Sequence, residues 1–99
     1  MMVLEDYYAG DEHWQRFVEV VKSNSISGED FGAYDLTELG EFPEDSTEIL
    51  NVAIAYFGYN RVIHWLNTSI AALDGKTPAE CISGDRKLKD RLKEYLMRL

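Results

Sequence analysis

The triplet Gly75-Lys76-Thr77 is the part of this chain that comes nearest to a catalytic motif. A phosphate-binding loop ends in the same residue types, and its lysine and hydroxyl group contact the phosphates and magnesium ion of a nucleotide. That loop also requires a preceding strand and a glycine five positions before Gly75, where this chain has Ile70. We therefore interpret Gly75 as a turn glycine with positive φ and Thr77 as a helix cap.

The two histidines and the single cysteine do not suggest a catalytic or metal-binding site either. His13 and His64 lie far apart in the sequence without an adjacent nucleophile, so hydrogen-bonded positions on helix faces are the favoured interpretation. Cys81, next to Ile82, is expected to be a small buried hydrophobe, and one cysteine forms no internal disulfide. The spacing of these residues does not fit metal ligands. We thus expect no catalytic residue, no metal and no cofactor, and hence no enzyme.

The charges are divided unevenly between the two halves of the chain. Residues 1–57 hold thirteen Asp and Glu against two basic residues, a net charge of −11. Residues 58–99 hold five acidic and eight basic residues, a net charge of +3. Nucleic-acid affinity comes mainly from Lys and Arg at the phosphates, so the acidic half is expected to repel DNA.

Length and composition favour one cytoplasmic domain. Ninety-nine residues, 45% of them hydrophobic, are enough for a single domain. Within it we expect residues 1–45 to form an acidic N-terminal part with one clear helix and residues 46–99 to form a helical part. No run of eighteen apolar residues is present, and residues 1–6 are acidic where a signal peptide is basic. No membrane partner is therefore expected.

The sequence predicts three helices before Gly58, the first from its apolar periodicity and the third from its length and capping residues. An amphipathic helix is expected over residues 11–24, and a short helix around residues 35–39. The nearly all-apolar residues 46–57 are expected to form a helix capped by Asp45 or Ser46, with a buried strand as the rival. Because apolar residues cover almost every face of this helix, it belongs in the centre of the domain or in an interface. A homodimer is the expected assembly.

Capping residues predict further helices after Gly58. Asn60 is expected to cap a helix over residues 61–66. Asp85 is expected to cap the last helix, from residue 86 to near residue 99, with an apolar stripe on one face. That stripe either completes the core or contacts a partner.

The strongest local signal is the segment Thr77-Pro78-Ala79-Glu80. Thr77 and Glu80 have the spacing of a capping box, and Pro78 fits the first helical position. This predicts a short helix over residues 78–82. Taken together, the expected elements form an all-α fold, a small orthogonal bundle of about five helices.

Several short motifs follow one another in the C-terminal part. They are Phe57-Gly58, Trp65-Leu66-Asn67-Thr68, Leu73-Asp74-Gly75-Lys76-Thr77-Pro78 and Ala79-Glu80-Cys81-Ile82, with a closing helix from Asp85. In these motifs residues 56–99 resemble the toxin-binding domain of Xre, MbcA and ParS-type antitoxins, formerly a domain of unknown function. The resemblance covers a little under half of the chain. Asp74 departs from the family pattern, which commonly has a glycine there.

The resemblance implies an antitoxin that binds a RES-domain toxin, an enzyme acting on NAD, and inhibits it by covering its active-site cleft. The residues that it marks as structural are Trp65, Asn67, Leu73, Gly75, Thr77 and Pro78. The candidates for partner binding are Lys76, Glu80, Lys93, Arg98 and Leu99. Their basic side chains can pair with carboxylates or occupy a site built for phosphates.

Two other classes of function stay open. The acidic half can make the chain an adaptor that binds a basic partner without any toxin. A DNA-binding regulator requires a basic helix in the major groove, and only the last helix can serve. Many members of the antitoxin family carry a DNA-binding half before the toxin-binding domain, and residues 1–57 do not match one.

Overall fold

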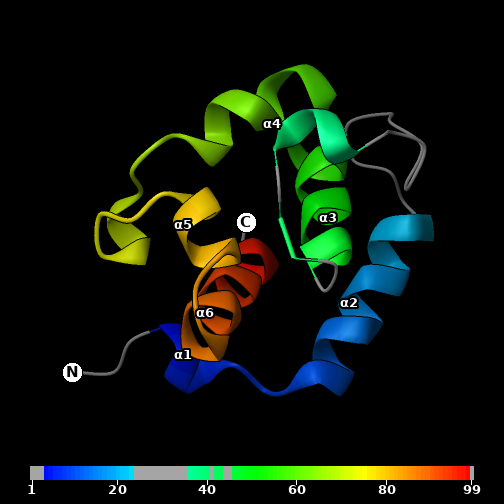
Figure 1. Ribbon diagram of the computed structural model, residues 1–99. Coiled ribbons are helices and arrows are strands. Elements are labelled where there is room, and N and C mark those ends of the chain that lie inside the picture. Colours follow the sequence, from blue (N-terminus) through cyan, green and yellow to red (C-terminus); the bar gives the residue numbers. More distant parts are fainter. Residues whose placement is uncertain (1–3, 24–35, 41, 44–45, 99) are drawn as a thin grey trace.

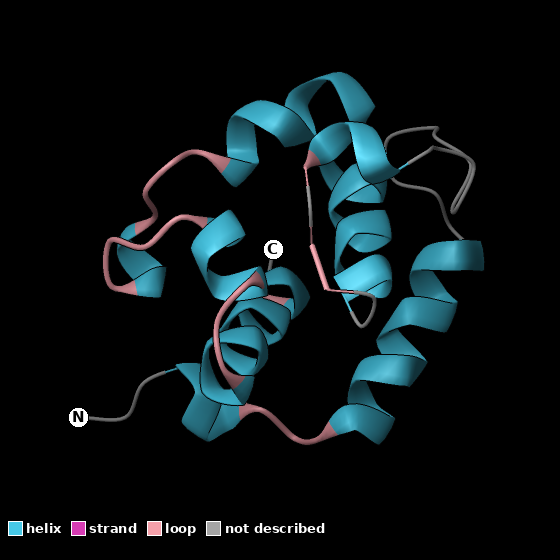
Figure 2. Cartoon of the chain, in the orientation of Figure 1, coloured by secondary structure: helices cyan, strands magenta, loops and turns pink. Residues whose placement is uncertain are grey.

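The computed structural model describes residues 4–23, 36–40, 42–43 and 46–98 (Figure 1). The α-helices are α1 (Leu4–Tyr7), α2 (Asp11–Ser23), α3 (Thr47–Phe57), α4 (Tyr59–Leu66), α5 (Pro78–Ile82) and α6 (Arg86–Met97). The described 3₁₀ helices are η1 (Leu36–Leu39) and η3 (Ala71–Leu73). The described residues contain no strand (Figure 2). The predicted all-α bundle of about five helices is thus confirmed, with α1 as an additional single turn.

Some of the predicted features reach beyond the described residues. Asn24, Asp35 and Leu99, at which predicted helices begin or end, lie outside them, as does the predicted cap Asp45. Among the described helices, none is both long enough and apolar enough to span a membrane.

Helix α2 turns one apolar face toward the interior, as its spacing predicts. Trp14, Val18 and Val21 recur every three or four residues and are buried. Asp11 and Glu12 lie in the first turn, where the positive end of the helix dipole stabilises their charge. The predicted amphipathic helix is confirmed over its described length.

Helix α3 is buried along most of its length and lies beside α2 and α4 (Figure 1). Every residue from Ile49 to Ala55 is buried, and the helix packs against α2, α4 and α6. The rival interpretation as a strand is therefore wrong. Since the apolar surface of α3 is covered within one chain, it no longer provides a reason to place this helix in an interface between two chains.

At the N-terminus of α3, Ser46, one of the two predicted capping residues, does not cap the helix with its side chain. Ser46 stands at the N-cap position, but its hydroxyl donates a hydrogen bond to the carbonyl of Pro43 and accepts none from the helix. Ser46 has φ of −89° and ψ of −4°, in the right-handed helical region, whereas the extended angles of a typical N-cap residue direct its side-chain oxygen toward the first helical N–H groups. The expected cap at Ser46 is corrected accordingly.

The boundary between α3 and α4 also differs from the prediction. Gly58, with φ of 84°, ends α3 by donating its N–H to the Ile54 carbonyl at 2.7 Å, and it is also the N-cap of α4. Its own carbonyl accepts from the N–H groups of Arg61 and Val62, each at 3.1 Å. The predicted cap at Asn60 is therefore wrong, because the positive φ of glycine turns the chain directly from one helix into the next.

The connection from α4 to α5 is a hydrogen-bonded turn. The Ile70 N–H donates to the Lys76 carbonyl at 3.1 Å, and the Ile70 carbonyl accepts from the Gly75 N–H at 3.0 Å. The φ angles of Asp74 and Gly75 are 57° and 78°, which confirms the positive φ predicted for Gly75. Asp74 thus adopts the left-handed conformation that glycine enters most easily. Leu73, fully buried, anchors the turn in the core.

The predicted caps of α5 and α6 are both confirmed. The Thr77 hydroxyl oxygen accepts from the Glu80 N–H at 3.1 Å, and the Glu80 carboxylate accepts from the Thr77 N–H at 3.0 Å. Pro78 occupies the first position of α5. The Asp85 carboxylate accepts from the Leu88 N–H at 3.0 Å. Each cap satisfies backbone donors that the first turn of a helix leaves unpaired.

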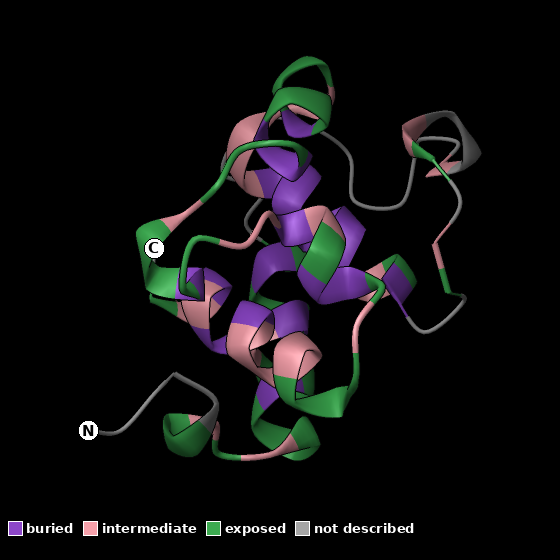
Figure 3. Cartoon of the chain, turned by 60° about the vertical axis from the view of Figure 1, so that its left-hand side comes forward, coloured by how far each residue is buried: buried purple, intermediate pink, exposed green. Residues whose placement is uncertain are grey.

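Helix α6 is the element around which the other helices are arranged (Figure 1). It packs against α1, α2, α3, α5 and η3. Leu92 and Leu96 are fully buried, and Leu88 and Tyr95 pack partly covered against the same core. The apolar stripe of α6 therefore completes the core of this chain. Figure 3 shows the buried residues gathered on the helix faces that meet in the interior.

Helix α1 has no counterpart among the elements that the sequence predicts. A single turn of helix has little stability of its own, so its formation depends on tertiary contacts. These contacts are made with α6, against which α1 packs. Gly10, with φ of 109°, lies between α1 and the start of α2.

Candidate partner-binding site

Lys93, a predicted partner-binding residue of α6, is engaged by the chain itself. Its side chain is 17% exposed, and its ammonium group lies 3.5 Å from Oδ1 of Asp11. The same group lies 5.6 Å from the ring centre of Tyr8 and 5.7 Å from that of Trp14. These are distances of cation–π attraction. Lys93 thus ties the N-terminal segment to α6 and leaves little of its surface open to a partner.

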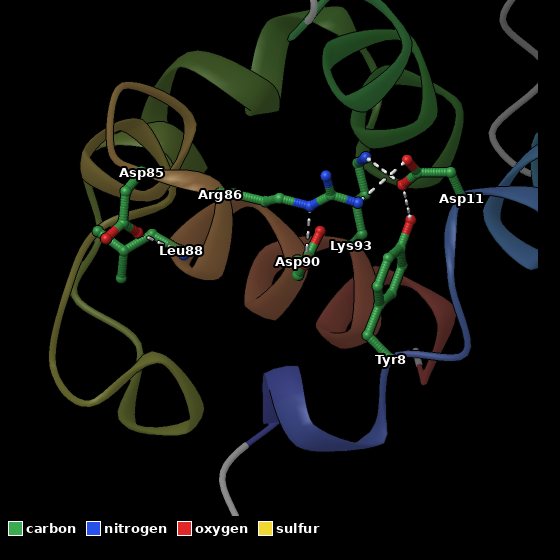
Figure 4. Close-up of polar contacts among 7 residues, drawn as sticks. All are labelled: Tyr8, Asp11, Asp85, Arg86, Leu88, Asp90 and Lys93. Atoms are coloured by element: carbon green, nitrogen blue, oxygen red, sulfur yellow. Dashed lines mark hydrogen bonds and ion pairs between the residues drawn. The ribbon is translucent and has the colours of Figure 1, made fainter.

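Asp11 is the centre of a group of polar contacts that we call the Asp11 network, formed by Tyr8, Asp11, Arg86, Asp90 and Lys93 (Figure 4). The Tyr8 hydroxyl donates to Asp11 Oδ1 at 2.8 Å. Arg86 reaches both carboxylates, with Nη2 3.6 Å from Asp11 Oδ2 and Nε 3.9 Å from Asp90 Oδ2. The network joins the connection between α1 and α2, the first residue of α2, and α6, through side chains that lie far apart in the sequence.

The Asp11 network shifts the pKa values of two of its members in opposite directions. The hydrogen bond from Tyr8, and after it the positive charges of Lys93 and Arg86, lower the pKa of Asp11 below its usual value of 3.8. Burial, together with the nearby carboxylate, raises the pKa of Tyr8 above its usual value of 10.0. Near neutral pH the carboxyl group is therefore charged and the phenol neutral, which are the states that their hydrogen bond requires.

Arg98 is the most accessible of the described basic candidates on α6. Its Nε donates to Oε2 of Glu94 at 2.6 Å, and its guanidinium group lies 5.0 Å from the ring centre of Tyr7. The Arg98 side chain is nevertheless 51% exposed, three times the exposed fraction of Lys93. Leu99, the next candidate, lies outside the described residues.

Lys76 and Glu80 lie at the turn before α5. The Glu80 carboxylate is exposed but is held in the capping box, where hydrogen bonds from Thr77 lower its pKa. Lys76 is partly buried, and its backbone carbonyl accepts the hydrogen bond from the Ile70 N–H that closes the turn. Both side chains lie at the surface, but Glu80 already has a structural role.

The residues that the resemblance marks as structural occupy structural positions. Trp65 is 9% exposed, Leu73 is fully buried, and Pro78 is buried at the start of α5. The exposed Asn67 donates its side-chain N–H to the Ile63 carbonyl at 2.9 Å, which helps to end α4. Gly75 and Thr77 shape the turn and the cap described above.

A groove that the sequence analysis did not identify opens beside α4. Its volume is about 580 Å³, and we call it the aromatic groove. It is lined by Phe57, Asn60, Arg61, His64, Trp65, Thr68, Ile70 and Tyr95. The groove therefore combines the end of α3, one face of α4, the turn after α4 and the C-terminal half of α6.

The apolar walls of the aromatic groove consist mainly of aromatic side chains. The rings of Phe57 and Trp65 are tilted by 33° with their centres 5.1 Å apart. Ile70 and Tyr95, each partly buried, pack against the same core and line the groove. Side chains of this kind supply most of the binding energy in protein interfaces.

The polar side chains of the aromatic groove follow the helical repeat of α4. Asn60, His64 and Thr68 are spaced four residues apart, and Arg61 lies three residues before His64. This spacing is the one signal in the sequence that points to a shared face. The sequence does not reveal that Tyr95 of α6 lies along the same groove, because that depends on how the helices pack.

The described residues that line the aromatic groove include no nucleophile beside a base. His64 is exposed, and the Thr68 hydroxyl donates to its backbone carbonyl at 2.8 Å, away from the imidazole. His13 lies on α2 outside the groove, and Cys81 is fully buried, as predicted. No group of three His, Cys, Asp or Glu side chains suited to a metal ion occurs within the described ranges.

The described residues form a small all-α fold with an open groove beside α4. No protein-family profile matches the chain, and comparisons with curated proteins and with solved structures find no significant match. The resemblance of residues 56–99 to the toxin-binding domain of antitoxins therefore stays a prediction.

Proposed function

We propose that this chain is an antitoxin-like protein that binds a RES-domain-type toxin acting on NAD and inhibits it by covering its active-site cleft. The observation that best supports this proposal is that three of the five resemblance motifs contribute residues to one accessible surface. Phe57 belongs to the first motif, Trp65 and Thr68 belong to the second, and Tyr95 belongs to the closing helix; all four line the aromatic groove. A binding role explains why these separate motifs share one surface.

In this proposal the aromatic groove provides the apolar centre of the interface. Partly covered rings beside a recess can take up an apolar side chain of the toxin and exclude water around it. Arg98, half exposed on α6, is the terminal basic residue best able to pair with a carboxylate or to occupy a phosphate-binding site of the toxin. Lys93 has a different role, because it holds the N-terminal segment against α6.

The proposal assigns no reaction to the chain itself. Inhibition follows from covering the cleft, so that NAD does not reach the catalytic groups of the toxin. A cytoplasmic location and a homodimer belong to the same proposal, and a twofold-symmetric pair would present two copies of the aromatic groove.

Co-expression with the neighbouring open reading frame tests this function. We expect that frame, expressed alone, to stop growth and to lower cellular NAD, and the present chain to restore both. Ile70→Glu, which places a charge in the aromatic groove, is expected to abolish the rescue. Ile63→Glu is the matched control, because Ile63 is 44% exposed on α4 and does not line the groove.

The proposed function fails if no neighbouring product is toxic, or if the wild-type chain leaves the toxicity unchanged. Circular dichroism and size-exclusion chromatography of both variants show whether a lost rescue reflects an unfolded protein. Should Ile70→Glu unfold, Arg61→Glu at the exposed edge of the same groove replaces it.

A further inference from the structure

The apolar part of the aromatic groove has room for one large side chain of a partner. The whole groove has a volume of about 580 Å³, which lies within the range of pockets that bind small molecules. Phe57, Trp65, Ile70 and Tyr95 line this space from four segments of the chain: α3, α4, the turn after α4 and α6. An aromatic or branched aliphatic side chain can therefore contact several walls at once, which is the geometry of an interface anchor.

The rim of the aromatic groove has the opposite charge from the chain as a whole. Its titratable groups are Arg61, His64 and Tyr95, and none of its lining residues is Asp or Glu, although the chain has a net charge of −8. Arg61 is exposed, and within the described part of the chain no carboxylate forms an ion pair with it.

Most of the other cations for which contacts are described have partners in the chain. Ion pairs to Asp or Glu are formed by Arg16, Lys22, Arg86, Arg91, Lys93 and Arg98. Arg61 differs from these cations in two ways. It lies beside an apolar recess, and its guanidinium group is available for an external anion. A guanidinium group in this position favours a carboxylate, with which it can form two parallel hydrogen bonds.

We infer that the aromatic groove recognises a protein segment in which one large apolar residue stands next to Asp or Glu. The apolar side chain packs against the rings that line the groove, and the neighbouring carboxylate pairs with Arg61. This inference rests on the proposed function for the identity of the partner, and on the described residues of the groove for the chemistry of the bound segment.

A nucleic acid also combines flat rings with negative charge, but it fits this groove less well. Affinity for nucleic acids depends on several cations that follow the phosphates, whereas this rim supplies one arginine and one histidine. The net charge of −8 opposes the approach of a polyanion. A protein segment with a single carboxylate needs only one cation, and its smaller charge is repelled less by the net charge of the chain.

Two peptides that differ at one position test the inference. The probes are acetyl-Gly-Phe-Asp-Gly-amide and acetyl-Gly-Phe-Lys-Gly-amide, titrated into the isotope-labelled protein and followed by NMR. We expect the Asp peptide to shift the indole N–H signal of Trp65 and the amide signals of residues 60–70. Its dissociation constant should be roughly threefold below that of the Lys peptide, the scale of one exposed ion pair.

A charge reversal within the groove and one outside it separate local recognition from net charge. Arg61→Glu is expected to invert the preference between the two peptides. Lys87→Glu changes the net charge equally at an exposed position of α6 outside the groove, so it should leave the preference unchanged. The inference is overturned if neither peptide shifts the groove signals, if both bind equally, or if Arg61→Glu keeps the wild-type preference.

This outcome can be distinguished from failure of the proposed function. If the wild-type chain neutralises a neighbouring toxin but shows no peptide preference, the function stands and the inference about the bound segment fails. If no toxin is found while the peptide preference holds and inverts in Arg61→Glu, the groove chemistry stands and the antitoxin role fails.

Discussion

Asp11 has two roles that depend on the same carboxylate. It lies in the first turn of α2, where the helix dipole stabilises a negative charge. It also accepts a hydrogen bond from the hydroxyl of Tyr8 and forms an ion pair with the ammonium group of Lys93. Lys93 follows Asp11 by 82 residues, so only the folded chain brings these charges together. The Asp11 carboxylate therefore couples the N-terminal segment to α6.

Replacing Asp11 by Asn tests this coupling through its pH dependence. The variant keeps an acceptor for Tyr8 and removes the charge. Because the folded-state pKa of Asp11 is lowered, its charge stabilises the fold above the unfolded value of 3.8, and this contribution is lost as the pH falls through the folded value. We expect Asp11→Asn to lower the free energy of unfolding by up to about 1 kcal/mol at neutral pH. This difference should close under acid conditions, as measured by urea unfolding.

Tyr8→Phe provides the control for this experiment. The hydrogen bond from Tyr8 is the largest cause of the lowered pKa of Asp11. In the Tyr8→Phe background, the pH dependence of the Asp11→Asn effect should therefore shrink, as a double-mutant cycle measures. An Asp11→Asn effect that stays the same from neutral to acid pH would contradict the described network.

At the scale of elements, short-range chemistry explains where most of the helices begin and end. Helix α5 has only five residues, too few to form without help, and its capping box satisfies donors at both Thr77 and Glu80. The turn before it places Ile70 in the aromatic groove, so the cap also contributes to the shape of the candidate site.

Thr77→Ala tests the contribution of this cap. The variant removes the side-chain oxygen that accepts the Glu80 N–H, and we expect the free energy of unfolding to fall by about 1 kcal/mol. Thr77→Ser keeps the acceptor and should retain most of the stability. Chemical unfolding followed by circular dichroism gives both values, and equal stability of the Ala and Ser variants would show that the cap is not needed.

Signals between residues within four positions predict several caps and turns correctly, whereas the caps expected at Ser46 and Asn60 do not form. The Thr77 cap, the Asp85 cap and the positive φ of Gly75 were all predicted and are all described in the structure. The prediction of a cap at Asn60 is wrong because Gly58 is both the C-cap of α3 and the N-cap of α4. Helix α1 was missed because its stability comes from α6 and not from its own sequence.

At the scale of the whole molecule, one hydrophobic core connects the acidic and the basic halves of the chain. Buried residues from α2, α3, α4, α5 and α6 belong to the same core, with Leu92 and Leu96 of α6 among them. The N-terminal and C-terminal helices are thus expected to unfold together. Tryptophan fluorescence and far-ultraviolet circular dichroism should then report the same transition.

Leu96→Ala tests the importance of α6 to this core. Leu96 is fully buried, so the variant leaves a cavity, and we expect the free energy of unfolding to fall by about 2–5 kcal/mol. That is a large share of the roughly 5–15 kcal/mol that stabilises a typical domain. Ile63→Ala removes as many carbon atoms from an exposed position and should cost less than about 1 kcal/mol. Urea denaturation measures both, and similar losses would contradict a core centred on α6.

The sequence by itself determined the helical class of this protein, most of its helix boundaries and the turn before α5. Those features depend on apolar periodicity and on hydrogen bonds between residues within four positions of one another. Tertiary structure alone decided that Asp11 and Tyr8 engage Lys93, and that Tyr95 meets Trp65 along the aromatic groove. The reason is that the packing of helices around Leu92 and Leu96 sets the distances between these side chains, and no local pattern encodes that packing.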